Sequence, residues 1–107
     1  MTDTSLIYVT APSREEALKL ARAVVEERLA ACGNVLGAIE SVYWWDGKLN
    51  QEPEVALILK TRADLVEALT ARVRELHPYE CPCVVALPIA AGNPAFLAWI
   101  AAETKPL

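Results

Sequence analysis

Residues 39–61 constrain the fold of this chain more than any other stretch, because they predict one long antiparallel hairpin. The first arm holds the aromatic and β-branched run VYWW at 42–45, and Asp46-Gly47 is a dipeptide that favours the positive φ of a tight turn. The second arm is apolar from 55 to 59 without alternation, which indicates that both of its faces are covered. Helices of the same chain can cover one face, so we expect another copy of the chain to cover the other.

Two adjacent tryptophans, Trp44 and Trp45, lie near the tip of this hairpin. Adjacent residues on a strand face opposite ways, so we expect one ring in the core and the other at an interface between subunits. Stacking of either ring on a ligand is the alternative.

Length and composition indicate one small domain. With 107 residues we expect a single domain over residues 1–107, large enough to bury a hydrophobic core. The hydrophobic share of 54% exceeds the usual range of about 45–50%, which fits a subunit that hides apolar surface in an oligomer. No stretch approaches the ~18 apolar residues of a membrane span, and MTDTSLIYVT lacks a signal-peptide pattern. We therefore expect a cytoplasmic protein with no membrane partner.

Charge, cysteine and glycine counts argue against three further classes of protein. Ten basic against fourteen acidic residues give a net charge of −4, so we expect no nucleic-acid partner. Three cysteines, an odd number, indicate reduced thiols rather than a disulfide framework. Four glycines are too few for a phosphate-binding loop, and no motif of a known catalytic type is present, so we expect no enzymatic activity.

A strand and a helix are predicted before the hairpin. Residues 6–10 are rich in strand formers, and Pro12 ends the strand because proline lacks a donor for the ladder. The run SREE at 13–16 matches the capping box that begins a helix. Apolar residues at spacings of three and four then predict one buried helix face, and Gly33-Asn34 predicts a left-handed cap at its end. The residues of that predicted face are Leu18, Ala21, Val25, Leu29 and Cys32.

A second helix, a last strand and a short closing helix are predicted after the hairpin. Residues 61–64 offer another capping pattern, and the apolar stripe that follows predicts a helix ending at His77. Residues 84–89 predict the last strand, and Asn93-Pro94 predicts the start of a closing helix. The order β-α-β-β-α-β followed by a short helix indicates an α+β, ferredoxin-like antiparallel sheet with both long helices on one face.

Thiols, an imidazole and a carboxylate gather in residues 77–83, HPYECPC. In an extended chain, residues two apart point to the same side, so the sulfurs of Cys81 and Cys83 could face one metal ion. The alternative, which the pattern alone favours, is a pair of small packing cysteines beside a histidine that caps a helix C-terminus. A thiol enzyme would use His77 to activate a cysteine, but the sequence places no third group to orient them.

Four blocks of sequence carry a resemblance to a known family. They are RLAACGN (28–34), SVYWWDGK (41–48), EVALILKT (54–61) and HPYECP (77–82). In this order and spacing they resemble the CutA divalent-cation tolerance family over nearly the whole chain, and VTAP (9–12) and GNPAFLAWI (92–100) resemble the family's ends. The resemblance implies a small cytosolic homotrimer, similar in architecture to the PII signalling proteins, in which long hairpins lock neighbouring subunits together.

The resemblance also implies a role for the protein and ligands for a metal. Family members are linked to tolerance of copper and other divalent metals, so we expect a response to metal ions and copper binding, with no other cofactor required. The implied ligands are Cys32 in the AAC block and His77 in the HPY block. Cys83 stands where the family has a glutamate, and a sulfur ligand in place of oxygen favours softer ions. The alternative is a PII-like trimeric sensor or scaffold that binds a small metabolite in the clefts between subunits.

Overall fold

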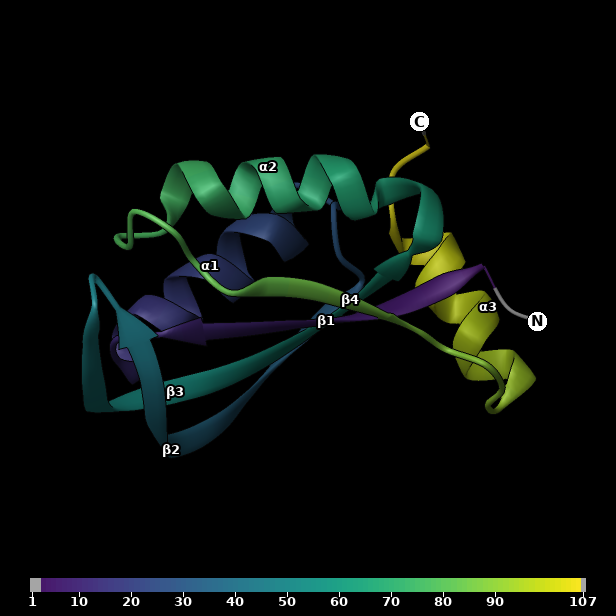
Figure 1. Ribbon diagram of the computed structural model, residues 1–107. Coiled ribbons are helices and arrows are strands. Elements are labelled where there is room, and N and C mark those ends of the chain that lie inside the picture. The colour runs from purple at the N-terminus through teal and green to yellow at the C-terminus, as the bar shows by residue number, and fades with distance from the viewer. Residues whose placement is uncertain (1–2, 107) are drawn as a thin grey trace.

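The computed structural model describes residues 3–106 as two layers, a four-stranded antiparallel sheet and a pair of helices on one of its faces (Figure 1). The elements are β1 (Thr4–Ala11), α1 (Arg14–Glu26), β2 (Cys32–Trp45), β3 (Lys48–Arg62), the 3₁₀ turn η1 (Ala63–Leu65), α2 (Val66–Leu76), β4 (Val84–Pro88) and α3 (Pro94–Glu103). The strands lie in the order β2-β3-β1-β4, and α1 and α2 cover the same face. This is the predicted ferredoxin-like α+β fold.

The β2–β3 hairpin turns at the predicted dipeptide and extends beyond the rest of the sheet. Asp46 and Gly47 have φ of 52° and 71°, the pair of positive values that a two-residue type I′ turn requires. β1 ends at Ala11, opposite Val55, whereas β2 and β3 remain paired up to the turn. Pro53 lies in this two-stranded part, where one edge of β3 is unpaired and a missing N–H is tolerated.

The core lies between the sheet and the two long helices. Val55, Leu57 and Leu59 of β3 face the helices and are buried, while Ala56 and Ile58 point to the opposite face of the sheet. Both sets are apolar, which accounts for the absence of alternation in this strand. The other fully buried large side chains of this core are Ile7, Val9, Leu20, Val24, Leu65, Leu69 and Val73.

The first helix ends earlier than predicted, and its predicted cap is wrong. α1 stops at Glu26, and Arg28 takes the left-handed conformation, with φ of 60°. The N–H groups of Arg28 and Leu29 donate to carbonyls of the last helical turn at 3.0 and 2.9 Å, which is the Schellman pattern of a helix C-terminus. Gly33 instead lies in β2. Arginine occupies the position where glycine is usual, so the sequence pattern carried no sign of this ending.

The predicted buried face of the first helix is wrong in part: Ala21 and Leu29 are buried and Val25 packs against the core, but the other two residues are not on a buried helix face. Leu18 is 44% exposed, and Cys32 lies in β2 rather than on the helix. The face that packs on the sheet consists of Ala17, Leu20, Ala21 and Val24. Small residues on this face let the helix approach the sheet closely. At the closest point, a Cβ atom added to Gly33 would lie 3.0 Å from the Cβ of Ala21 and 2.9 Å from Leu59 Cδ2.

The other predicted helix ends are confirmed, with one exception. The hydroxyl of Ser13 accepts a hydrogen bond from the N–H of Glu16 at 3.2 Å, and the side chain of Asn93 caps α3. α2 stops at Leu76, directly before His77, as predicted. The capping pattern at 61–64 is wrong, because Thr61 lies in β3 and its buried hydroxyl donates to the carbonyl of Leu29 at 2.6 Å.

We expect the Gly33→Ala variant to lose about 1–3 kcal/mol of unfolding free energy, because the added methyl group overpacks the contact between β2 and α1. Gly92→Ala is the matched control, since a Cβ at Gly92 would meet only Leu97, at an ordinary distance of 3.5 Å. Urea unfolding at one protein concentration measures both variants. Equal stability of the two would contradict the close approach at Gly33.

Candidate functional site on the open face of the sheet

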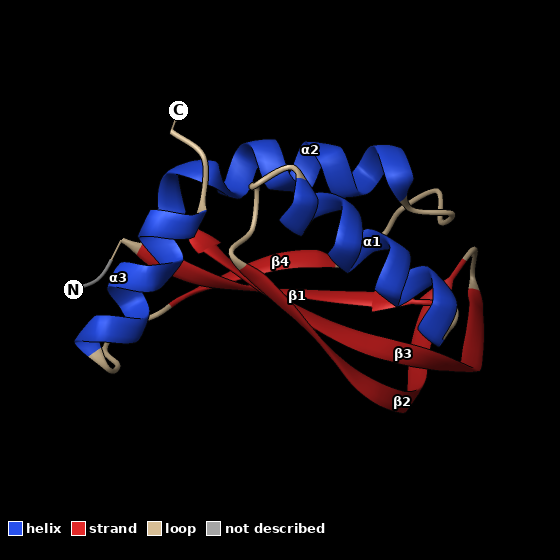
Figure 2. Cartoon of the chain, turned by 180° about the vertical axis from the view of Figure 1, so that it is seen from behind, coloured by secondary structure: helices blue, strands red, loops and turns tan. Residues whose placement is uncertain are grey.

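The sheet face away from α1 and α2 carries a hollow of about 660 Å³. We call this surface the open face; by strand register it consists of Leu6, Tyr8, Thr10, Ala56, Ile58, Val85 and Leu87, with Tyr43, Trp45 and Glu54 on the hairpin. The helix α3 packs against one end of it, where Lys60 Nζ lies 5.6 Å from the centre of the Phe96 ring. The hollow lies between the hairpin and the loop that follows α2, which meet at one end of the molecule (Figure 2). Its lining includes two thiols, two carboxylates and three phenols, from Cys81, Cys83, Glu54, Glu80, Tyr8, Tyr43 and Tyr79.

His77 fastens the loop to the sheet through both nitrogens of its ring. The side chain is 7% exposed, and its Nε2 lies 2.7 Å from the carbonyl oxygen of Thr10. The N–H of Tyr79 donates to Nδ1 at 3.1 Å, so the proton of the neutral ring is on Nε2 and is donated to Thr10. The rings of His77 and Tyr79 also pack together, with centroids 4.6 Å apart. A metal ion could use this imidazole only by displacing one of its two hydrogen bonds.

Tyr79 and Glu54 form a second link between the loop and the hairpin. The Tyr79 hydroxyl donates to the Glu54 carboxylate at 2.9 Å. Burial, together with this carboxylate, raises the pKa of Tyr79, so the phenol remains a hydrogen-bond donor at neutral pH. Neither residue was singled out from the sequence. The one feature of the sequence that could have indicated this link is the position of Glu54, a carboxylate directly before the apolar run of β3.

The two cysteines of the loop differ in exposure but border the same hollow. Cys81 is exposed, and Cys83 is half-buried directly before β4. Burial raises the pKa of the Cys83 thiol, and the nearby Glu54 carboxylate raises it further. The Cys83 thiol is therefore protonated at neutral pH in the absence of a cation.

Cys32 lies at the other end of the open face. It pairs with Lys60, whereas Cys83 lies at the level of Thr10, which pairs with Ala56. The two levels are four residues apart along β3, roughly 13 Å, and β2 and β4 are separated by three strand spacings, roughly 14 Å. Cys32 and Cys83 of one chain therefore cannot bind the same ion.

Within residues 3–106 of a single chain, no group of three or more histidine, cysteine, aspartate and glutamate side chains is placed to hold a metal ion. The structure brings Cys81 and Cys83 to one hollow, with His77 in the same loop, and leaves Cys32 apart. The ligand set His77, Cys32 and Cys83 requires residues from more than one chain, and it stays a prediction.

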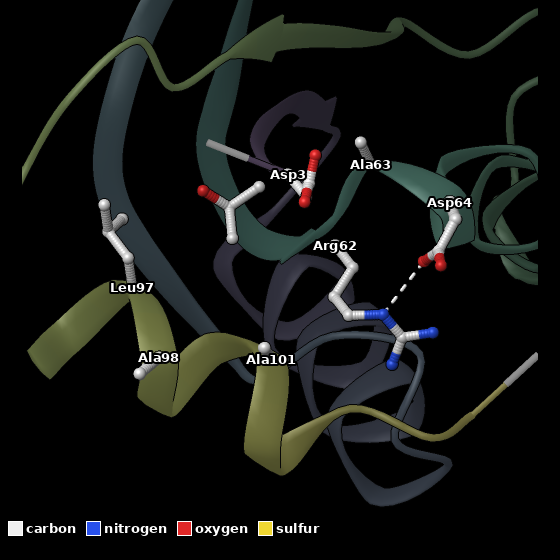
Figure 3. A pocket seen from close by; sticks show the side chains of 8 residues that line it. Asp3, Arg62, Ala63, Asp64, Leu97, Ala98 and Ala101 are labelled. Carbon is white, nitrogen blue, oxygen red and sulfur yellow. Dashed lines mark hydrogen bonds and ion pairs between the residues drawn. The ribbon is translucent and has the colours of Figure 1, made fainter. Parts of the chain in front are cut away.

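A second hollow, of about 530 Å³, lies at the opposite end of the sheet, between α3 and the ends of β1 and β3 (Figure 3). Arg62 dominates it, with Nε 2.9 Å from Asp64 Oδ1. The guanidinium also donates to the backbone carbonyls of Thr104 and Lys105 at 3.3 and 2.6 Å. These bonds tie the segment after α3 to the end of β3, so we assign Arg62 a structural role.

The fold and the open face define a class of protein: a small ferredoxin-like domain with a long, aromatic-tipped hairpin and a thiol-lined hollow on the sheet face away from α1 and α2. Residues 5–103 match the model of the family described as "CutA1 divalent ion tolerance protein". The chain belongs to this family, as its sequence blocks predict.

Known proteins similar to this chain come from several kingdoms. "Protein CutA 1, chloroplastic" of rice is 46% identical, over 94% of this chain and 56% of the rice protein. "Divalent-cation tolerance protein CutA" of Pyrococcus horikoshii is 42% identical, over 94% of this chain and 97% of that protein. The solved structure of the Thermus thermophilus divalent cation tolerance protein superimposes with a TM-score of 0.92 at 42% identity, covering 95% and 99% of the two chains. The chain spans little more than half the length of the plant and animal relatives that it matches.

We expect His77→Leu to lower the unfolding free energy by about 2–4 kcal/mol, because it leaves the Thr10 carbonyl and the Tyr79 N–H without partners in a buried place. Tyr79→Phe is the control: it removes only the bond to Glu54 and should cost about 1 kcal/mol. Urea unfolding compares the two variants with the wild type. If His77→Leu is no less stable than Tyr79→Phe, the histidine does not fasten the loop.

Proposed function

We propose that this protein is a homotrimeric metal-binding protein of the cytoplasm, which takes up copper or a similarly soft ion through thiols at the boundaries between its subunits. Membership of the divalent ion tolerance family supports a role in the response to metal ions. The observation that carries the proposal is the placement of two thiols, Cys81 and Cys83, in a hollow of a sheet face that also carries exposed apolar side chains in a single chain.

Exposed apolar side chains on the open face support assembly with other copies. Val85, Leu87 and Trp45 are 50–53% exposed in the single chain. Contiguous exposed apolar patches of this kind mark protein–protein interfaces. The helix α3 adds to the patch, because it is apolar on all sides yet buries only Ile100, and a helix of that composition is usually covered.

The hairpin tip favours a ring over a two-fold dimer. Trp45 belongs to the open face, whereas Trp44 and Val42 point the other way and are 72% and 64% exposed. The tip therefore offers apolar side chains on both faces, which is expected of an arm that passes between neighbours. Contacts between unlike surfaces close into rings, and a ring of three is the assembly that the family resemblance implies.

A ring also offers a way to complete the predicted ligand set. The hollow borders the open face, so its thiols would lie at a subunit boundary, and Cys32 at the far end of the same face would approach the hollow of a neighbour. His77 would join the set by releasing its bond to Thr10 or to Tyr79. Thiolates favour copper and zinc over magnesium and calcium, which prefer oxygen.

The cytoplasm suits the chemistry of this site. The free thiols of Cys32, Cys81 and Cys83 persist in a reducing compartment, and metal binding requires them reduced. In the part of the chain that the structure describes, no helix is long and apolar enough to cross a membrane.

A metabolite sensor or scaffold is the second candidate function, and the size and lining of the hollow favour it. A volume of about 660 Å³ falls in the range of roughly 300–1,000 Å³ that is typical of small-molecule sites. Aromatic rings of Tyr43, Trp45 and Tyr79 supply flat apolar walls, and Glu54 and Glu80 supply polar contacts. In this case metal binding would be incidental.

We expect Trp45→Ala to weaken the trimer, because truncation of a packed aromatic side chain costs about 3–5 kcal/mol. Multi-angle light scattering over a dilution series measures the change as a shift toward monomer. Leu18→Ala is the control, since Leu18 is exposed on α1, away from the open face. A wild-type protein that is monomeric at micromolar concentration would contradict the proposed assembly.

The reduced wild type should bind Cu(I), Cu(II) or Zn(II) more tightly than any member of a panel of nucleotides and other small metabolites, as measured by isothermal titration calorimetry. Cys83→Ser should weaken metal binding by roughly tenfold or more, because it removes the soft donor that replaces the family's glutamate. Cys83→Glu is the matched variant and should shift the preference toward harder ions. Binding of a metabolite without any metal binding would favour the sensor.

A further inference from the structure

We infer that Cys81-Pro82-Cys83 is a two-thiolate site for Cu(I) that is complete within one chain. This site rests on the proposed function, metal binding at the hollow, and adds the identity of the ion and of its two ligands. It differs from the set of His77, Cys32 and Cys83 because it needs neither the imidazole nor a neighbouring subunit.

The backbone holds the two cysteines in place before any ion binds. Proline fixes its own φ near −65° and restricts the residue before it to extended conformations, so Pro82 limits the freedom of Cys81. Cys83 is fixed on the other side, because Val84 is already paired with Val9 in the sheet. Both thiols are free and border the same hollow. A chelating pair held in this way loses little conformational entropy on binding.

Two of the other donors near the two thiols already have partners, and the third, Glu80, is a hard oxygen donor. Both nitrogens of His77 are hydrogen-bonded, and the Glu54 carboxylate accepts a bond from Tyr79. No third histidine, cysteine or acidic side chain within residues 3–106 completes a metal-binding group. Zn(II) in proteins needs four ligands, whereas Cu(I) is satisfied by two thiolates. The two free soft donors, Cys81 and Cys83, therefore match Cu(I).

The charges around the hollow favour a cation in place of the thiol protons. Glu54 and Glu80 both line it, so a cation bound there lies beside two carboxylates. The cation neutralises thiolate charge and is attracted to these carboxylates. In the binding step each sulfur releases its proton to solvent and forms a bond to copper, which stays in the +1 state.

Anaerobic competition titration with Cu(I) and the chelator bicinchoninate tests this site on the reduced, full-length protein. We expect one Cu(I) per chain in the wild type. Loss of a residue that only supports a metal ligand typically lowers metal affinity by roughly 10- to 100-fold. Cys81→Ser and Cys83→Ser remove a ligand itself, so each should lower the affinity for Cu(I) by at least that factor. Cys32→Ser tests the set shared between subunits and should still bind one Cu(I) per chain. Leu18→Ala, exposed on α1 and away from the hollow, is the control and should bind as the wild type does. X-ray absorption should report two sulfur neighbours around copper and no nitrogen.

The outcomes separate this site from the proposed function. Wild-type affinity in Cys81→Ser, with a loss in Cys32→Ser, would overturn the two-thiolate site and leave the set shared between subunits. Failure of the wild type to bind any of Cu(I), Cu(II) and Zn(II) would overturn both. Thermal unfolding of Cys81→Ser and Cys83→Ser without copper, compared with the wild type, shows whether a lost affinity reflects the missing thiol or a disturbed fold.

Discussion

The position of β3 at the centre of the sheet is the constraint on which the rest of the structure depends. β3 pairs with β2 on one side and β1 on the other, and its side chains are apolar on both faces. The two long helices can cover only one of these faces. The chain therefore builds its core with Val55, Leu57 and Leu59 and leaves Val85, Leu87 and Trp45 half-exposed on the opposite face. The hollow, the exposed tryptophans of the hairpin and the apolar α3 all follow from this unequal division.

The loop after α2 positions the two thiols of the hollow on this sheet. His77 bonds to β1 and Tyr79 bonds to β3, so the loop is fixed at two points by side chains that need not touch a ligand. The cysteines follow directly after these two anchors, and β4 begins directly after the cysteines. A segment that looks irregular in the ribbon is thus held from both ends. Rigid support of this kind is what a binding site requires for its donors to keep their geometry.

Much of the fold was predictable because local rules and tertiary packing agree there. The turn at Asp46-Gly47, the cap at Ser13 and the end of α2 before Pro78 each depend on a few neighbouring residues. The end of α1 was not predictable, because an arginine occupies the left-handed position and two apolar stripes compete on an alanine-rich helix.

The site was predictable only in part, and the reason is strand register. The sequence places Cys81 and Cys83 together, and the structure keeps them at one hollow. The sequence does not show that Cys32 lies at the far end of the sheet, because the position of Cys32 depends on which residue of β3 it pairs with. The pairing of Tyr79 with Glu54 likewise joins residues 25 positions apart, through contacts that no local pattern encodes.

The Arg62 anchor has a mechanical consequence. Its guanidinium donates hydrogen bonds to the backbone carbonyls of Thr104 and Lys105, directly after α3. The N–H of Lys105 also donates to the carbonyl of Arg28. A pull on the C-terminal end would therefore pass into β3 and the end of α1 before it reached α3. Because β3 is bonded along both edges, such a load must shear two rows of hydrogen bonds at once instead of peeling one helix away. The exposed helix α3 is in this way protected by a strand that is paired on both sides in its second half.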